Sequence, residues 1–438
     1  MIRALFFVVK LALLVMAAVW LALRPGQVVI NWQGYEVAMP LAVLLVGVAG
    51  LVVLAVAFHA LWRALVSIPR SFSLAHMSRR QRKGYIALTQ GLAAVAAGDG
   101  SAARRLAHKA GKFLNEPSLT LLLQAQAAQL NGDEMAASRY FGEMMARPDM
   151  SVLGLRGMVT QALSRGDTTQ ALALARRAHM LQPKAEWVLT SLVDLEARAG
   201  NAEAALVALS SAAKQGAIDP NRSRILRSTL LLESASKAGA GEVLRLAKKA
   251  YDTAPGWSPA AIHYARLVLA SGHVRLAAKI IERTWRTAPH PELAKLYAEA
   301  GGDIPSTTQV KRFERLASFN PDAAESRLAL ARIALSAQLW GIARAQLDAV
   351  LAKGPNARAC RLMAELEERE FSNMRTAREW QERAAAAPPE AGWQCEACHA
   401  PVSSWTGTCP SCGALGRVGW HMPFTPKQPE ILAISHKN

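Results

Sequence analysis

The chain has 438 residues, of which 51% are hydrophobic and 19% charged, and this balance excludes an intrinsically disordered protein. Aromatic residues make up only 6%, and Ala and Leu dominate the apolar content, which favours helices over β-sandwiches and barrels. The formal net charge of +18 indicates an anionic partner, for which a membrane surface and nucleic acid are both candidates.

The first 83 residues have the pattern of a membrane anchor. Ala4 to Leu23 is a run of 20 residues in which Lys10 is the one charged residue, and Val37 to Leu61 is a run of 25 residues without Asp, Glu, Lys or Arg. Each run is long enough to cross a hydrocarbon core of about 30 Å, and the second run favours retained helices over a cleaved signal peptide. We therefore predict two transmembrane helices, at about 4–23 and 37–61, joined by a short periplasmic loop.

The charges that flank these runs predict their orientation. The loop Arg24–Glu36 carries one basic and one acidic residue, whereas a basic stretch without acids follows the second run. That stretch contains Arg63, Arg70, Arg79, Arg80, Arg82 and Lys83. The positive-inside rule then places both termini in the cytoplasm, at a bacterial inner membrane, with the basic stretch against anionic lipid. Because no interleaved aromatics or known reader motif accompany it, nucleic acid is not an expected partner.

Residues 84–390 contain an internal repeat. Gly followed by Asp or Asn occurs at Gly98, Gly132, Gly166 and Gly200, each 34 residues after the last. A series of prolines has nearly the same period: Pro117, Pro148, Pro183, Pro220, Pro255, Pro289, Pro321, Pro355 and Pro389. Two markers with one period indicate an array of helix pairs.

The spacing within one repeat resembles the tetratricopeptide (TPR) pattern. In the repeat that begins at Val152, Gly166 forms the turn, Ala171 and Ala178 are the small residues of the second helix, and Pro183 ends it. Small residues allow paired helices to approach closely, and stacked pairs bury a continuous core in an α-solenoid. We expect irregular joints at 219–226 and at 290–320, the latter with a short helix at 291–300 and then a polar loop.

No enzyme motif occurs in the array. The sequence has no G-x-S-x-G, H-E-x-x-H, P-loop or dinucleotide-binding fingerprint, so we predict neither catalytic nor cofactor-binding residues. The histidines lie in different repeats, which is typical of packing or surface residues and does not favour haem binding. Cys360, on a helix predicted at 358–371, is expected to be a small buried hydrophobic residue.

Four cysteines near the C-terminus form the most specific motif. They are Cys395, Cys398, Cys409 and Cys412, a pair of C-x2-C turns within 18 residues. Each turn directs two thiolates to one point, and two turns complete a tetrahedral shell of four sulfurs. We therefore predict a metal-binding knuckle at 393–420, which Trp393, Trp405 and Trp420 cover.

A filled shell of four sulfurs indicates a structural site, without the open position that catalysis needs. Zinc is the preferred metal, and iron remains possible, since sites with four thiolates accept both. The knuckle should fold only with metal and either cap the last repeat or offer a docking surface. Residues 421–438, with three prolines, are expected to be a flexible tail.

The order of these parts resembles the HemY-type inner-membrane TPR proteins of Gram-negative bacteria. The resemblance covers residues 1 to about 390 and is most specific in the first 140. The stretches that carry it are Met1-Ile-Arg-Ala-Leu-Phe-Phe7, Gly34-Tyr-Glu-Val37, Arg79-Arg-Gln-Arg-Lys83 and Gly84-Tyr85. It implies a non-enzymatic scaffold for late protohaem biosynthesis, with partners such as ferrochelatase or protoporphyrinogen oxidase.

The knuckle is similar to the rubredoxin-like end of the TPR adaptors of lipopolysaccharide assembly, which have one membrane span. That resemblance implies an alternative, an adaptor that controls envelope lipid synthesis through the turnover of an enzyme. Direct binding of haem or porphyrin in the groove is a third hypothesis. The two predicted spans and the Gly-Tyr-Glu segment favour the HemY interpretation.

Overall fold

The computed structural model describes residues 12, 15–16, 19–20, 26–32, 34–114 and 116–423. The first predicted span (4–23) therefore lies mostly outside the described residues, although Ala12, Val15, Met16, Val19 and Trp20 are helical. The predicted tail is outside them from residue 424 onward. The chain divides into two compact units, Met1–Asp133 and Glu134–Asn438, and each is described by itself.

The first unit begins with a hairpin of two strands, β1 (Gln27–Trp32) and β2 (Tyr35–Pro40), paired antiparallel. Gly34, at the turn between them, has a φ of +92°, a conformation that glycine adopts without strain. The predicted start of the second span at Val37 is wrong, because residues 37–40 belong to β2. Helix α2 (Leu41–Ala96) begins directly after them.

Helix α2 contains the one segment among the described residues that is long and apolar enough to cross a membrane. This segment, Val43–Arg63, has 21 residues, a mean hydropathy of 2.6, and no part buried inside the protein. Its length is about 32 Å at 1.5 Å per residue, close to the thickness of a bilayer core. Val46, Leu51 and Leu54 are each more than 70% exposed, so the segment has no protein core to pack against. Lipid is the environment that suits such a surface.

The C-terminal part of α2 is also the first helix of the array. It packs against α3 (Gly100–Phe113) and α4 (Pro117–Leu130). A Cβ on Gly91 would lie 2.6 Å from Leu123 Cδ2, so only glycine permits this approach. One continuous helix thus joins the apolar segment to the first repeat, and the basic residues Arg79 to Lys83 lie on it, exposed.

The second unit is a series of antiparallel helices. They are α5 (Glu134–Met145), α6 (Ser151–Ser164), α7 (Thr168–Leu181), α8 (Glu186–Arg198), α9 (Ala202–Lys214), α10 (Pro220–Lys237), α11 (Ala240–Thr253), α12 (Ser258–Ala270), α13 (Val274–Trp285), α14 (Pro291–Glu299), α15 (Ser306–Ser318), α16 (Ala324–Ser336), α17 (Trp340–Leu351), α18 (Ala357–Phe371) and α19 (Met374–Ala386). Each helix packs against the next from α5 to α14 and from α15 to α19, and α10, α12, α14, α16 and α18 also contact one another in turn. The predicted α-solenoid is confirmed, and these even-numbered helices form one continuous face.

The repeat markers have the structural roles that their spacing predicts. Gly98, Gly132, Gly166 and Gly200 turn between helices with φ of +69° to +78°. Asp167, next to one of them, accepts a hydrogen bond from the backbone N–H of Gln170 and caps α7. Cys360 is buried in α18, as predicted.

Both predicted irregular joints need correction. Residues 220–226 lie within α10, because Asp219 caps that helix and Pro220 occupies its first turn, where a missing N–H costs nothing. The short helix at 291–300 is confirmed as α14, but the expected polar loop contains α15. Val310, Phe313 and Leu316 follow the helical period and are buried, and the sequence interpretation overlooked them.

Close packing between α5 and α6 leads to a first prediction. A Cβ on Gly157 would lie 2.2 Å from Phe141 Cε1, 2.3 Å from Cδ1 and 2.5 Å from Cζ, whereas one on Gly142 meets nothing within 4 Å. We expect Gly157→Ala to destabilise the protein by about 1 to 3 kcal/mol through overpacking. Gly142→Ala should stabilise it by about 0.5 kcal/mol, because a helical glycine loses more entropy. Thermal melts of the full chain in detergent measure the change in melting temperature of each variant. A change of the same sign in both variants would contradict the prediction.

Candidate metal centre and its seat on the array

The structure brings the four predicted cysteine ligands together. Their sulfur atoms all lie within 4.8 Å of one another, and the Cys395–Cys412 and Cys398–Cys409 Sγ–Sγ distances are both 3.7 Å. A disulfide would need about 2.05 Å. Four sulfurs at about 2.3 Å from a tetrahedral zinc ion lie about 3.8 Å apart. The separations therefore fit a shared metal ion and not a pair of disulfides.

Short elements of the knuckle hold the sulfurs in place. Strands β3 (Gly392–Cys395) and β4 (Val418–His421) pair antiparallel. The backbone N–H of Gly413 donates to the Cys409 carbonyl at 2.9 Å, and Gly413 has a φ of +68°, so the second C-x2-C segment is a tight turn. Cys395 and Cys409 are buried, and Cys398 and Cys412 are exposed.

The electrostatics of the four thiols also favour a bound cation. Burial would raise the pKa of Cys409, but backbone N–H groups of Cys412 and Ser411 and the neighbouring thiols lower it to about 7. At Cys412 the backbone N–H of Ala414 favours the thiolate, yet burial and the three other sulfurs raise the pKa to about 12. The Cys409 sulfur therefore ionises before that of Cys412, and a bound cation would offset the repulsion between the two thiolates.

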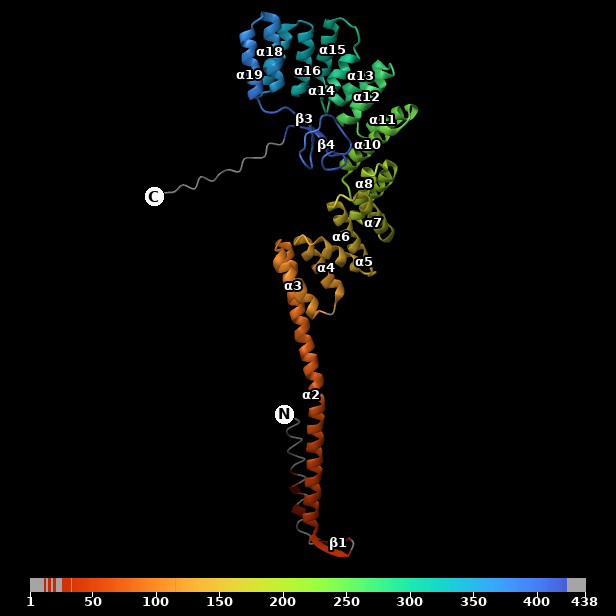
Figure 1. The fold of residues 1–438 in the computed structure, drawn as a ribbon, viewed down its shortest axis with the longest axis vertical. Helices are drawn as coiled ribbons and strands as arrows, with labels where there is room; N and C mark the ends of the chain where they lie inside the picture. The colour runs from red at the N-terminus through yellow and green to blue at the C-terminus, as the bar shows by residue number, and fades with distance from the viewer. Residues whose placement is uncertain are drawn as a thin grey trace, which may run out of the picture. The chain divides into compact units, whose positions relative to one another are not determined.

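One sequence interpretation placed the knuckle as a cap on the last repeat, and the structure shows a different position. Figure 1 shows β3 and β4 inside the curve that α8 to α19 follow. The core of the array from α10 to α16 includes Trp393, Cys395, Cys409 and Val418 as buried members. We call the face formed by α10, α12, α14, α16 and α18 the inner face. The knuckle rests on its middle part.

Two charged side chains of α10 bind the backbone and a hydroxyl of the knuckle. The Arg222 guanidinium donates to the carbonyl of Leu415 at 2.7 Å and to that of Gly416. Glu233 accepts from the hydroxyl of Thr408 at 2.8 Å. Burial lowers the pKa of Arg222 and raises the pKa of Glu233, so both groups have lost water that these hydrogen bonds replace.

Aromatic rings make the remaining contacts. The Trp405 ring centroid lies 5.4 Å from that of Trp257 and 5.3 Å from that of His263, both edge-on. Trp393 and Trp420 lie 4.9 and 4.5 Å from the His290 ring. The tryptophans that the sequence interpretation assigned to a cover of the metal site therefore face the array, and their rings fix the knuckle to the inner face.

His290 gives a prediction about pH. It is 1% exposed, and its Nδ1 accepts from the backbone N–H of Glu292. Burial lowers its pKa to about 4, Glu292 raises it, and Arg358 lowers it further. In the unseated or unfolded state the pKa of His290 is near 6.5, so His290 binds more protons there than in the seated knuckle. Acidification therefore destabilises the seated knuckle.

We expect the stability of the seated knuckle to fall by about 1 kcal/mol between pH 7.5 and pH 5.5. Urea unfolding of the zinc-loaded full chain, followed by tryptophan fluorescence, measures this. His290→Asn retains a capping acceptor but cannot titrate, so it should remove this part of the pH dependence. An unchanged dependence in His290→Asn would contradict the role of His290.

Sequence reasoning predicted that the four cysteines cluster but missed the residues that seat the knuckle. Arg222 and Leu415 are 193 residues apart, and Trp393 Nε1 donates to Glu292 across 101 residues. Neither local spacing nor composition signals such pairs. A weak signal exists at His263, since the sequence interpretation had assigned the histidines of the repeats to packing or surface positions.

The helical array, the apolar part of α2 and the four-cysteine cluster together define a membrane-associated α-solenoid protein with a candidate metal site. A family model described as HemY protein N-terminus matches residues 26–132. The resemblance to HemY-type proteins, drawn from the sequence, is confirmed for this segment, which contains β1, β2 and α2 to α4.

Among curated proteins, the chain is 28% identical to "Probable magnetosome protein Mms48" of Magnetospirillum gryphiswaldense, over 96% of this chain and 93% of that protein. Among solved structures, a tetratricopeptide repeat protein from Parabacteroides merdae is 15% identical, with a TM-score of 0.28, over 53% of this chain and 98% of that one. "Naa15/Naa10 bound to HypK-THB" is 14% identical, with a TM-score of 0.42, over 71% of this chain and 50% of that one. The solenoid assignment rests on the helix contacts described above.

Proposed function

We propose that the chain is a non-enzymatic scaffold that holds partner proteins at the cytoplasmic face of a bacterial inner membrane. The observation that carries this proposal is the continuity of α2. The helix is apolar and exposed over Val43–Arg63, and its C-terminal part packs in the array against α3 and α4. A rigid helix of this kind keeps the array close to the bilayer. Partners that bind the array then meet at a raised local concentration.

The proposed orientation follows from the charges near the membrane. Arg63 is the last residue of the apolar segment, and Arg79, Arg80, Arg82 and Lys83 follow it on α2; all five are exposed. Basic residues are retained on the cytoplasmic side and attract anionic lipid, each contributing about 1 kcal/mol. This supports a cytoplasmic array, and two spans with both termini cytoplasmic remain part of the proposal.

We further propose that the knuckle holds one structural zinc ion through Cys395, Cys398, Cys409 and Cys412, with iron as the alternative. The ion would supply charge neutralisation and a fixed crossing point for the two C-x2-C turns. The buried Cys395 and Cys409 then keep the knuckle surface that faces α10 to α14 in one conformation. Metal analysis of the purified chain distinguishes zinc from iron.

The partners that we propose are enzymes of late protohaem synthesis. The match of residues 26–132 to the HemY N-terminal model supports this choice. Tethering such enzymes would keep a poorly soluble porphyrin near its next enzyme. The envelope-lipid adaptor remains the second candidate, because the knuckle lies on the surface where an α-solenoid usually binds its partner.

The experiment is depletion of the chain in its own bacterium. We expect cellular protoporphyrin to rise several-fold and haem to fall, while each enzyme keeps its activity in lysates. The full chain should restore both, and so should a chain whose residues 43–63 are replaced by an unrelated transmembrane helix. Normal porphyrin and haem with altered lipopolysaccharide would reject the haem role in favour of the adaptor.

A further inference from the structure

A cavity of about 470 Å³ lies on the inner face, between α14, α16 and α18, beside the knuckle. Cavities of this size hold small ligands or several peptide side chains. Its position differs from that of the four sulfurs, and none of the cysteines lines it. Trp420 of β4 forms one wall, so the knuckle completes the cavity.

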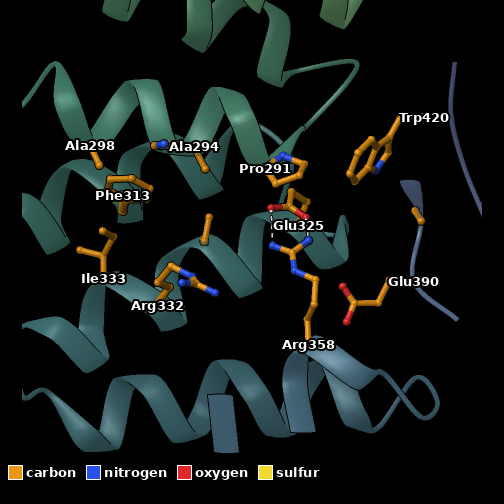
Figure 2. Close-up of a pocket in the computed structure, with 13 residues that line it drawn as sticks. Pro291, Ala294, Ala298, Phe313, Glu325, Arg332, Ile333, Arg358, Glu390 and Trp420 are labelled. Atoms are coloured by element: carbon orange, nitrogen blue, oxygen red, sulfur yellow. Dashed lines mark hydrogen bonds and ion pairs between the residues drawn. The ribbon is translucent and has the colours of Figure 1, made fainter. Parts of the chain in front are cut away.

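One end of the cavity is apolar. Ala294, Ala298, Phe313, Ala329 and Ile333 line it, from α14, α15 and α16. Figure 2 shows Ala298, Phe313 and Ile333 grouped together, away from Trp420 and the ion pair. This end suits an aliphatic or aromatic side chain, because burial of apolar area contributes about 25 cal/mol per Å².

The other end is polar but electrically balanced. Arg358 donates to both carboxylate oxygens of Glu325, at 2.6 and 3.1 Å, and Figure 2 marks this pair. Glu390 is paired with Arg361 through a single contact, from Nη2 to Oε1. Both acids of the lining therefore already have a cationic partner.

Two basic residues at the rim differ from these. Lys295 on α14 and Arg332 on α16 are exposed and line the cavity. Neither makes an ion pair with any residue in the described part of the chain. The rim thus carries two positive charges without counter-charge, next to an apolar floor. An anionic group beside an apolar one is the complementary chemistry.

The shape favours an extended ligand. A second cavity of about 190 Å³ continues from the first, sharing Glu325, Arg358, Glu390, Ala391 and Trp420 as lining residues. It runs on to Pro388, Pro389 and Met422. A trough along the inner face of a solenoid accommodates a peptide better than a compact metabolite.

We propose that this trough, bounded by the knuckle, binds a short acidic segment of a partner protein. The segment places an aliphatic or aromatic side chain on Phe313 and Ile333 and a neighbouring Asp or Glu against Lys295 and Arg332. This inference rests on the proposed scaffold function and names the chemistry of its partner. Because Trp420 belongs to the knuckle, the binding site exists only while the knuckle is seated.

The experiment selects a phage-displayed library of random octapeptides against the full, zinc-loaded chain in lipid nanodiscs. We expect enrichment of peptides with Asp or Glu within two positions of Leu, Ile or Phe. The combined substitution Lys295→Glu and Arg332→Glu should weaken the selected peptide about tenfold, since two favourable charges become repulsive. Lys311→Glu with Arg378→Glu, an equal change at exposed residues outside the trough, should leave the affinity unchanged.

Two results would overturn the proposal. One is equal affinity of the selected peptide for both double variants. The other is saturable binding of oleate that needs Lys295 and Arg332, with no enriched peptide, which would make the ligand a fatty-acid anion. Either result leaves the porphyrin measurement in depleted cells unaffected, so failure of this site is distinct from failure of the haem role.

Discussion

Replacing Cys395 and Cys409 together by serine is expected to release the knuckle from the inner face. These two residues are the buried cysteines of the cluster and are part of the core between α10 and α16. Without metal the few apolar residues of the knuckle cannot offset its conformational entropy, and small structural zinc sites of this kind unfold. The bound metal should fall from about one ion per chain to almost none.

Trypsin provides the readout of that release. Arg417 is the one Lys or Arg within residues 393–420, and the next residue, Val418, is buried in β4. Cleavage after Arg417 should be slow in the native chain and at least about tenfold faster in the double variant. Cys360→Ala, which removes the one cysteine outside the cluster, is the matched control. Slow cleavage in a metal-free double variant would show that the knuckle folds without metal.

The second large effect is expected from Arg222→Met, which keeps the metal ligands intact. Arg222 satisfies the carbonyls of Leu415 and Gly416, both buried, and methionine retains the bulk but donates nothing. Leaving two buried carbonyls unpaired should destabilise the seated knuckle by about 2 to 4 kcal/mol. Cleavage after Arg417 should therefore rise although the metal content stays at about one ion per chain.

The neighbouring Arg224 offers the control. It is exposed on the same helix and bonds the side chain of Asn221. Arg224→Met should change the stability by less than about 0.5 kcal/mol. Loss of metal in Arg222→Met, or equal cleavage of the two variants, would argue against α10 as the seat of the knuckle.

The repeats and the cluster of four cysteines could be predicted because both depend on local spacing. The Gly turns recur every 34 residues, and each C-x2-C turn is complete within four residues. The start of α2 was missed because Val37 to Pro40 is as apolar as the helix that follows. Hydropathy alone does not distinguish an apolar strand from an apolar helix over so few residues.

The position of the knuckle depends on pairs that no local pattern reveals. Thr408 meets Glu233 and Trp405 meets Trp257 only because the chain after α19 returns along the inner face. The trough beside Trp420 is likewise formed by α14, α16, α18 and the knuckle together. Such sites arise from the stacking of repeats and not from any one of them.

A photo-crosslink in living cells most directly tests whether the knuckle lies on the middle of the array. Trp405 is replaced by p-benzoylphenylalanine, an aromatic analogue of similar size, in the full chain at its native membrane. Trp257 and His263 are its nearest aromatic neighbours, so adducts should map to residues 254–270 and should disappear when Cys395 and Cys409 are serine. Adducts on α18 or α19 instead would show that the knuckle caps the end of the array and leaves the inner face open.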